Sequence, residues 1–158
     1  MFVALTALEC VLAHLASPVA AQPQQPPRQL TVLSLNSLRR GSPASAVNDA
    51  VFQKVLGAGQ SSRLDYYAED GDLARFSGPE YDQTVRDYLR GKYGGRRFDV
   101  VIASGDSALE FAARYRDELF PGTPIVFSTR PGSPVPTNAT GVFVDVNLHD
   151  TVGMIAAL

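Results

Sequence analysis

Short apolar runs alternate with longer stretches of helical period along this chain, and this alternation restricts the folds it can adopt. The apolar runs lie at residues 30–35 (LTVLSL), 98–103 (FDVVIA), 124–128 (PIVFS) and 140–146 (TGVFVDV), and a half-polar run lies at residues 63–70 (RLDYYAED). FDVVIA is continuous, as in a central strand covered on both faces, whereas RLDYYAED is typical of a half-exposed edge strand. The pattern predicts an α/β fold with a doubly wound parallel sheet, right-handed crossovers and the strand order 2-1-3-4-5.

Three helices are predicted between these runs, each with an apolar stripe. Ser42 is a suitable cap and Pro43 a suitable first residue for a helix that ends at Gly57. The second helix opens at residues 77–80 and closes at Gly91 or Gly94, and the third begins near Ser107. The expected buried faces are, in order, Val47, Ala50, Val51 and Val55; then Tyr81, Val85, Tyr88 and Leu89; then Ala108, Phe111, Ala112, Tyr115 and Leu119.

The first 21 residues are apolar and end in small residues, with Val19 and Ala21 suitably placed for signal peptidase cleavage before Gln22. We therefore expect residues 1–21 to be an export signal and residues 22–29 (QPQQPPRQ) to be an extended leader, and we expect the mature protein to be periplasmic. Anchoring to the inner membrane by the N-terminal segment is the alternative. Glu9 and His14 disfavour it, because a charge near the bilayer centre costs about 2.5–3.5 kcal/mol.

Charge and cysteine content exclude several classes of protein. The chain has 14 basic and 16 acidic residues and a net charge of −2, whereas a nucleic-acid surface is normally basic. We therefore expect no nucleic-acid partner. Cys10 is the single cysteine and lies in the predicted signal, so the mature chain is expected to have no disulfide. Residues 22–158 suffice for one domain with a core and are too few for two.

The turn Ser104-Gly105-Asp106-Ser107 follows the most continuous apolar run. A nucleophile elbow at Ser107 requires glycine where Leu109 stands and a histidine base, of which the mature chain has only His149. Asp106 is instead suited to cap the following helix, and amides at a helix start attract the carboxylate or phosphate groups of a ligand. The turn thus favours the wall of a small-molecule cleft, with an exported α/β serine hydrolase using Ser107 as the alternative.

Cofactor and metal motifs are weak. Residues 57–60 (GAGQ) lack the third glycine of a dinucleotide fingerprint, and the sequence has no GxxxxGK phosphate loop. The acidic residues Asp65, Glu69, Asp70 and Asp72 lack EF-hand spacing and are typical of a solvated edge loop. We therefore expect no cofactor and no metal site.

Polar residues follow the predicted strands where each strand ends. Because the carboxyl ends of parallel strands share one edge of the sheet, these residues are expected to converge on a ligand. Arg130 is either a partner for an anionic ligand or a surface arginine. The candidate ligand-binding residues are Asn36, Ser37, Ser104, Gly105, Asp106, Ser107, Ser128, Thr129, Arg130 and Asp145.

The segments RFDVVIAS, RDELFPGTPIVF and NATGV, in this order, resemble the substrate-binding proteins of ABC transporters with a type I periplasmic-binding fold. The closest likeness is to the version that serves as the extracellular sensor of bacterial histidine kinases. The resemblance covers Leu30 to the end of the sequence. It implies a Rossmann-like lobe, a small-molecule solute as ligand, no catalysis, and an ABC permease or a sensor histidine kinase as partner.

The same family has two lobes. The resemblance implies that residues 30–147 form the amino-terminal lobe and that residues 148–158 start the crossover helix to a second lobe beyond this sequence. Val152, Met154, Ile155 and Leu158 then lack the cover of that lobe, which predicts either a homodimer or a mobile tail for residues 149–158.

Overall fold

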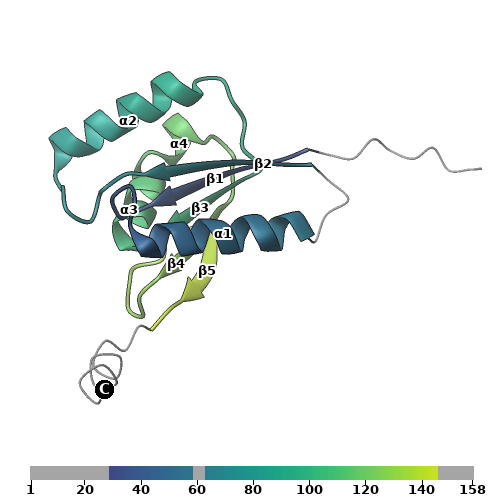
Figure 1. The fold of residues 1–158 in the computed structure, drawn as a ribbon. Coiled ribbons are helices and arrows are strands. Elements are labelled where there is room, and N and C mark those ends of the chain that lie inside the picture. Colours follow the sequence, from purple (N-terminus) through teal and green to yellow (C-terminus); the bar gives the residue numbers. More distant parts are fainter. Residues whose placement is uncertain (1–28, 59–62, 146–158) are drawn as a thin grey trace, which may run out of the picture.

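The computed structural model describes residues 29–58 and 63–145, which form five strands and four helices (Figure 1). The strands are β1 (Leu30–Asn36), β2 (Leu64–Asp70), β3 (Val100–Ser104), β4 (Ile125–Thr129) and β5 (Ala139–Phe143). The helices are α1 (Pro43–Ala58), α2 (Pro79–Tyr93), α3 (Asp106–Arg114) and α4 (Arg116–Leu119). The predicted signal, residues 148–158 and His149 lie outside the described residues, as does nearly all of the predicted leader.

All strands pair in parallel, in the order β2-β1-β3-β4-β5. The α/β class and the predicted strand order are therefore confirmed. Strand β2 is an edge strand, as its half-polar pattern predicts, and β5 forms the other edge. Because β1 and β3 are neighbours near the middle of the sheet, the residues that follow them come together at its carboxyl edge.

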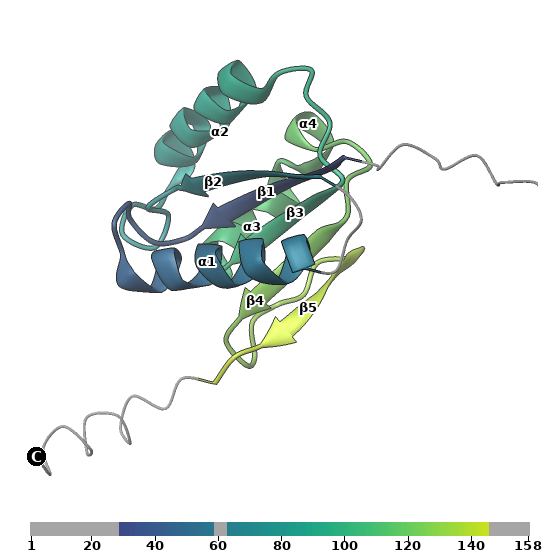
Figure 2. The ribbon, with the colours of Figure 1, turned by 45° about the vertical axis from the view of Figure 1, so that its right-hand side comes forward.

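The two faces of the sheet are covered differently. Helix α1 lies across one face, and α2, α3 and α4 lie on the other (Figures 1 and 2). The larger core lies on the side of α2 and α3, where alternate strand residues pack against Leu89 of α2, Phe111 of α3 and Phe120, which directly follows α4. The strand residues of this core are Leu33, Leu35, Val101, Ala103, Ile125 and Phe127.

Helix α1 presents a different face to the sheet from the one that its valines predict. Val47, Val51 and Val55 are 61%, 49% and 63% exposed, and Ala50 is exposed as well. Tyr66 of β2 donates a hydrogen bond of 2.7 Å to Asp49 and so helps to fix the rotation of the helix. The predicted buried face is therefore wrong. The residues that face the sheet are Ser45, which is buried, and Asn48, Asp49, Phe52 and Leu56, which are half-buried.

A carboxylate occupies the most buried position of β2. Glu69 is only 5% exposed and accepts hydrogen bonds from Lys92 (2.6 Å), from Tyr88 (3.2 Å) and from Tyr93. These three donors on α2 allow a charged group to be buried there. Glu69 therefore belongs to the contact between β2 and α2 and not to a solvated loop.

The other helices follow their predictions with two changes. On α2, Val85 and Leu89 are buried as expected, but Tyr88 is 49% exposed, and Asp82 and Tyr93 are buried. The helix closes at Gly94, one of the two predicted positions. The predicted third helix is divided at Tyr115 into α3 and α4.

No helix within the described residues combines the length and the hydropathy needed to cross a bilayer.

Candidate functional site

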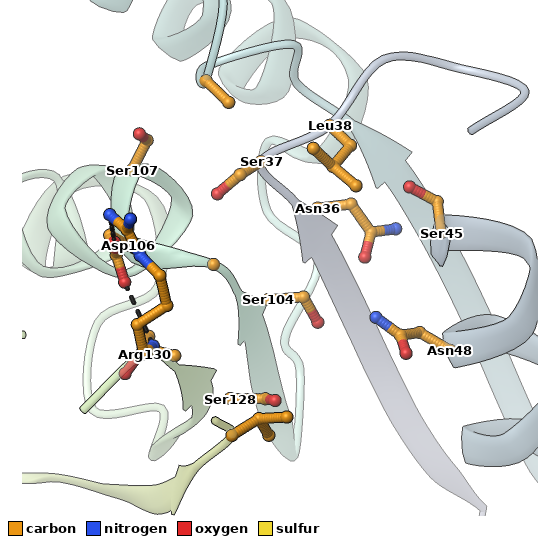
Figure 3. Close-up of a pocket in the computed structure, with 14 residues that line it drawn as sticks. Asn36, Ser37, Leu38, Ser45, Asn48, Ser104, Asp106, Ser107, Ser128 and Arg130 are labelled. Carbon is orange, nitrogen blue, oxygen red and sulfur yellow. Dashed lines mark hydrogen bonds and ion pairs between the residues drawn. The ribbon is translucent and has the colours of Figure 1, made fainter. Parts of the chain in front are cut away.

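A cavity of about 560 Å³ opens at the carboxyl ends of β1, β3 and β4 (Figure 3). Its volume lies in the range of small-molecule sites, which is about 300–1,000 Å³. Its walls come from the ends of these strands, the first turns of α1, the start of α3 and the loop after β4. The lining residues are Asn36, Ser37, Leu38, Ser45, Asn48, Ala74, Ser104, Gly105, Asp106, Ser107, Ser128, Thr129, Arg130 and Val144.

Parallel register produces one wall of this cavity. Asn36 of β1 pairs with Ser104 of β3, and Ser104 pairs with Ser128 of β4. Residues in register on adjacent parallel strands point to the same face and lie about 4.8 Å apart. These three side chains, here called the polar row, face Ser45 and Asn48 of α1 (Figure 3).

The turn between β3 and α3 forms a second wall. Gly105 has φ 91° and ψ 159°, a conformation that L side chains rarely adopt. Ser37 approaches it closely and accepts a hydrogen bond of 2.8 Å from the amide of Ala108 in the first turn of α3. The first amides of a helix have no partner within it, and Asp106 and Ser107, which carry two of these amides in α3, line the cavity.

Asp106 does not cap α3 as predicted, because its carboxylate points toward Arg130 and Ser133. Arg130 donates to Asp106 from Nε at 2.8 Å and also forms an ion pair with it through Nη2. Ser133 donates to the other carboxylate oxygen at 2.7 Å. Partial burial opposes ionisation of Asp106, but the hydrogen bonds from Ser133 and Arg130 and the guanidinium charge lower its pKa. The cap is instead the hydroxyl of Ser37, which belongs to another segment of the chain.

Several buried polar atoms at the cavity have no hydrogen-bond partner within the part of the chain that the structure describes. They are Asn36 Oδ1, Ser45 Oγ, Ser104 Oγ and Thr129 Oγ1, on residues that are 1%, 3%, 7% and 3% exposed. An unpaired buried polar atom typically costs about 1–3 kcal/mol. A fold that keeps four such atoms around one cavity is well suited to a ligand that pairs with them.

The structure brings together all the sequence-predicted site residues except Asp145, which is exposed and lies two residues beyond the end of β5. The sequence reasoning missed Ser45 and Asn48 because it assigned the buried face of α1 by its valines. Two polar residues three positions apart at the start of an apolar helix were the available signal. Leu38, Ala74 and Val144 complete the lining and carried no signal of their own.

Ser107 lines the cavity but has no neighbouring histidine among residues 29–58 and 63–145, and His149 lies outside them. These same residues contain no group of His, Cys, Asp and Glu side chains placed to hold a metal ion. The described site can therefore contact a ligand through hydrogen bonds from its polar side chains and through the fit of the ligand to the cavity walls.

The fold and the cavity define an α/β protein with a parallel five-stranded sheet and a candidate small-molecule site at its carboxyl edge. No protein-family model, no curated protein and no solved structure matches the chain.

Proposed function

We propose that this protein is a non-catalytic solute-binding or sensor domain that holds a small molecule at the carboxyl ends of its strands. The observation that carries the proposal is the set of buried, unpartnered polar atoms around one cavity, namely Asn36 Oδ1, Ser45 Oγ, Ser104 Oγ and Thr129 Oγ1. A ligand that pairs with these atoms removes the cost of leaving them unpaired.

The proposal includes the type I periplasmic-binding identity that the sequence resemblance implies. In that arrangement the described residues are the amino-terminal lobe, the protein is exported to the periplasm, and closure of a second lobe reports the solute to an ABC permease or a sensor histidine kinase. The strand order of the sheet, β2-β1-β3-β4-β5, and the position of the cavity at its carboxyl edge support this assignment. Export is tested by fractionation of cells that express the full sequence with a C-terminal tag, and recovery only from the cytoplasm contradicts it.

The binding function is tested by a thermal-unfolding screen. The protein is titrated with amino acids, sugars, polyols, nucleosides and small organic anions, since a ligand that binds only the folded state raises the melting temperature. We expect at least one compound to stabilise the protein, and its effect to be reduced by Ser104→Ala. A screen in which no compound binds at millimolar concentration contradicts the proposal.

The exported serine hydrolase is the second candidate, because Ser107 lies at the cavity. It predicts hydrolysis of a chromogenic short-chain ester, with the activity lost in Ser107→Ala. The solute-binding proposal predicts no ester hydrolysis above that of the variant, so turnover abolished by this substitution favours the hydrolase.

A further inference from the structure

Most of the side chains that line the cavity are uncharged and carry a hydrogen-bonding group. Its lining contains hydroxyl or amide side chains at Asn36, Ser37, Ser45, Asn48, Ser104, Ser107, Ser128 and Thr129. Among the lining residues that the structure describes, the charged ones are Asp106 and Arg130, and these pair with each other at the rim. The side chains that line the cavity therefore carry no net charge.

The orientation of Asn36 is fixed by a neighbour outside the cavity. Its Nδ2 donates a hydrogen bond of 3.1 Å to Asp70 Oδ1, which leaves Oδ1 as the unpartnered atom. A carboxylate accepts and never donates, so it holds the amide with its oxygen toward the cavity. The ligand must therefore supply a hydroxyl or N–H donor at this point. The hydroxyls of Ser45, Ser104 and Thr129 both donate and accept, so they suit further hydroxyl groups.

A charged ligand is disfavoured in this site for two reasons. Moving a charge from water into a cavity without an opposite charge has a large desolvation cost. The positive charge of Arg130 is already balanced by Asp106, which it contacts through Nε and Nη2, so an anionic ligand that binds the remaining N–H groups also meets the nearby carboxylate. An uncharged ligand forms hydrogen bonds with the buried unpartnered atoms and leaves the ion pair between Asp106 and Arg130 intact.

We propose that the cavity binds an uncharged, hydroxyl-rich solute, of the class of polyols and neutral monosaccharides. The hydroxyl groups of the solute form hydrogen bonds with the polar row and with Ser45 and Asn48 of α1. The side chains of Leu38, Ala74 and Val144 contact its carbon skeleton. This inference rests on the proposed function and names the class of solute for the same cavity.

The test uses sugars that differ in charge at nearly constant size. Isothermal titration calorimetry is carried out with D-ribose, D-xylose, D-glucose, D-galactose, myo-inositol and ribitol, and then with D-glucosamine and D-glucuronate. We expect at least one neutral compound to bind, and its affinity to exceed those of the cationic and anionic sugars by about tenfold or more. Tighter binding of a charged sugar, or no binding of any neutral compound, overturns the inference.

The outcome separates this inference from the function on which it rests. If the sugars and polyols fail and a compound of another class binds in the broader screen, only the class of solute is wrong. If no compound binds in either experiment, the solute-binding function fails as well.

Variants locate the binding at the unpartnered atoms. Ser104→Ala and Thr129→Val each remove one such hydroxyl, and each is expected to weaken binding of the neutral solute about threefold to tenfold, the value of one neutral hydrogen bond. The melting temperature of the unliganded variants should stay unchanged or rise, because a buried unpaired group is removed. If the two hydroxyls had only a structural role, their removal would lower both the affinity for the solute and the melting temperature. Unchanged affinity in both variants contradicts the assignment of these hydroxyls to the binding site.

Ser34→Ala is the matched control. Ser34 is fully buried on β1, two residues before Asn36, and does not line the cavity. Its substitution removes a hydroxyl of the same kind and should leave the affinity for the solute unchanged.

Discussion

Gly105 is the residue on which the geometry of the candidate site depends most directly. A Cβ atom at this position lies 2.6 Å from Ser37 Oγ, and φ is 91°. Gly105→Ala therefore adds backbone strain and displaces the hydroxyl that caps α3. We expect a loss of about 1–3 kcal/mol or more in the free energy of unfolding, measured by urea denaturation.

Gly122→Ala is the control for this prediction. Gly122 also has a positive φ, of 73°, but a Cβ there meets no atom within 4 Å. It is expected to cost only about 1 kcal/mol of backbone strain. Equal losses in the two variants contradict the importance of the contact between Gly105 and Ser37.

The ion pair at the rim predicts a pH dependence of stability. The pKa of Asp106 is lower in the folded protein than the ordinary value of 3.8, so folding favours the ionised form. Its contribution is complete above that ordinary value and is lost as the pH falls through the lowered pKa. We expect Arg130→Gln to flatten the dependence of stability on pH below about pH 4, measured by urea denaturation at several pH values.

Arg97→Gln serves as the control for the change in net charge, because Arg97 is exposed and precedes β3, whereas Asp106 follows the opposite end of this strand. If Arg97→Gln and Arg130→Gln alter the acid limb of the stability curve equally, the effect belongs to net charge and not to the pair.

At the scale of the element, α1 gives a direct test of the corrected helix orientation. Val51 is 49% exposed, whereas its neighbour Phe52 is half-buried against the sheet. Val51→Ala should change stability by less than about 0.5 kcal/mol. Phe52→Ala should cost about 1–3 kcal/mol, because truncation of a fully buried phenylalanine costs about 3–5 kcal/mol. Chemical denaturation of the two variants measures this difference in the free energy of unfolding. A larger loss for Val51→Ala than for Phe52→Ala contradicts the observed orientation of α1 and supports the one expected from the sequence.

The elements differ in how far the sequence predicts them. Strand β3 was identifiable because FDVVIA is apolar except for Asp99, and the start of α1 was identifiable because Pro43 follows a suitable cap. The buried face of α1 was not identifiable from the sequence. The rule that apolar residues face inward fails where the inner face of a helix lines a polar cavity. Ser45 and Asn48 lie on that inner face, and the valines remain outside.

Strand β2 holds a residue whose burial was not predicted. The alternation of Leu64, Tyr66 and Ala68 with polar neighbours correctly predicts a half-exposed edge strand, but Glu69 was assigned to a solvated loop. In the structure Glu69 is the most buried residue of the strand and Ala68 is exposed. The carboxylate is tolerated because Lys92, Tyr88 and Tyr93 surround it, and donors that come from another element are not visible in a local pattern.

For the whole molecule, the strand order was predictable because alternating strands and helices with right-handed crossovers permit few topologies. That order also located the candidate site, since it brings the turns after β1, β3 and β4 together. The resemblance to ABC transporter substrate-binding proteins and the export of the protein stay predictions.

The homodimer stays a prediction as well, and edge strand β5 gives it a test. Val142, Phe143 and Val144 are 60%, 50% and 44% exposed, and an exposed apolar edge favours association. We expect a concentration-dependent dimer in sedimentation velocity, shifted toward the monomer by Val142→Lys. Val135→Lys, in the loop before β5, is the control for added charge. A wild-type protein that stays monomeric at all concentrations contradicts the prediction.

The hydrogen bond from the amide of Ala108 to Ser37 joins residues that lie 71 positions apart in the sequence. The polar row likewise joins β1 to β3 and β3 to β4. Contacts between distant residues form slowly, because a long loop must close before they are made. During synthesis the cavity is therefore incomplete until β4 has left the ribosome, and the nascent chain has no complete candidate site before that point.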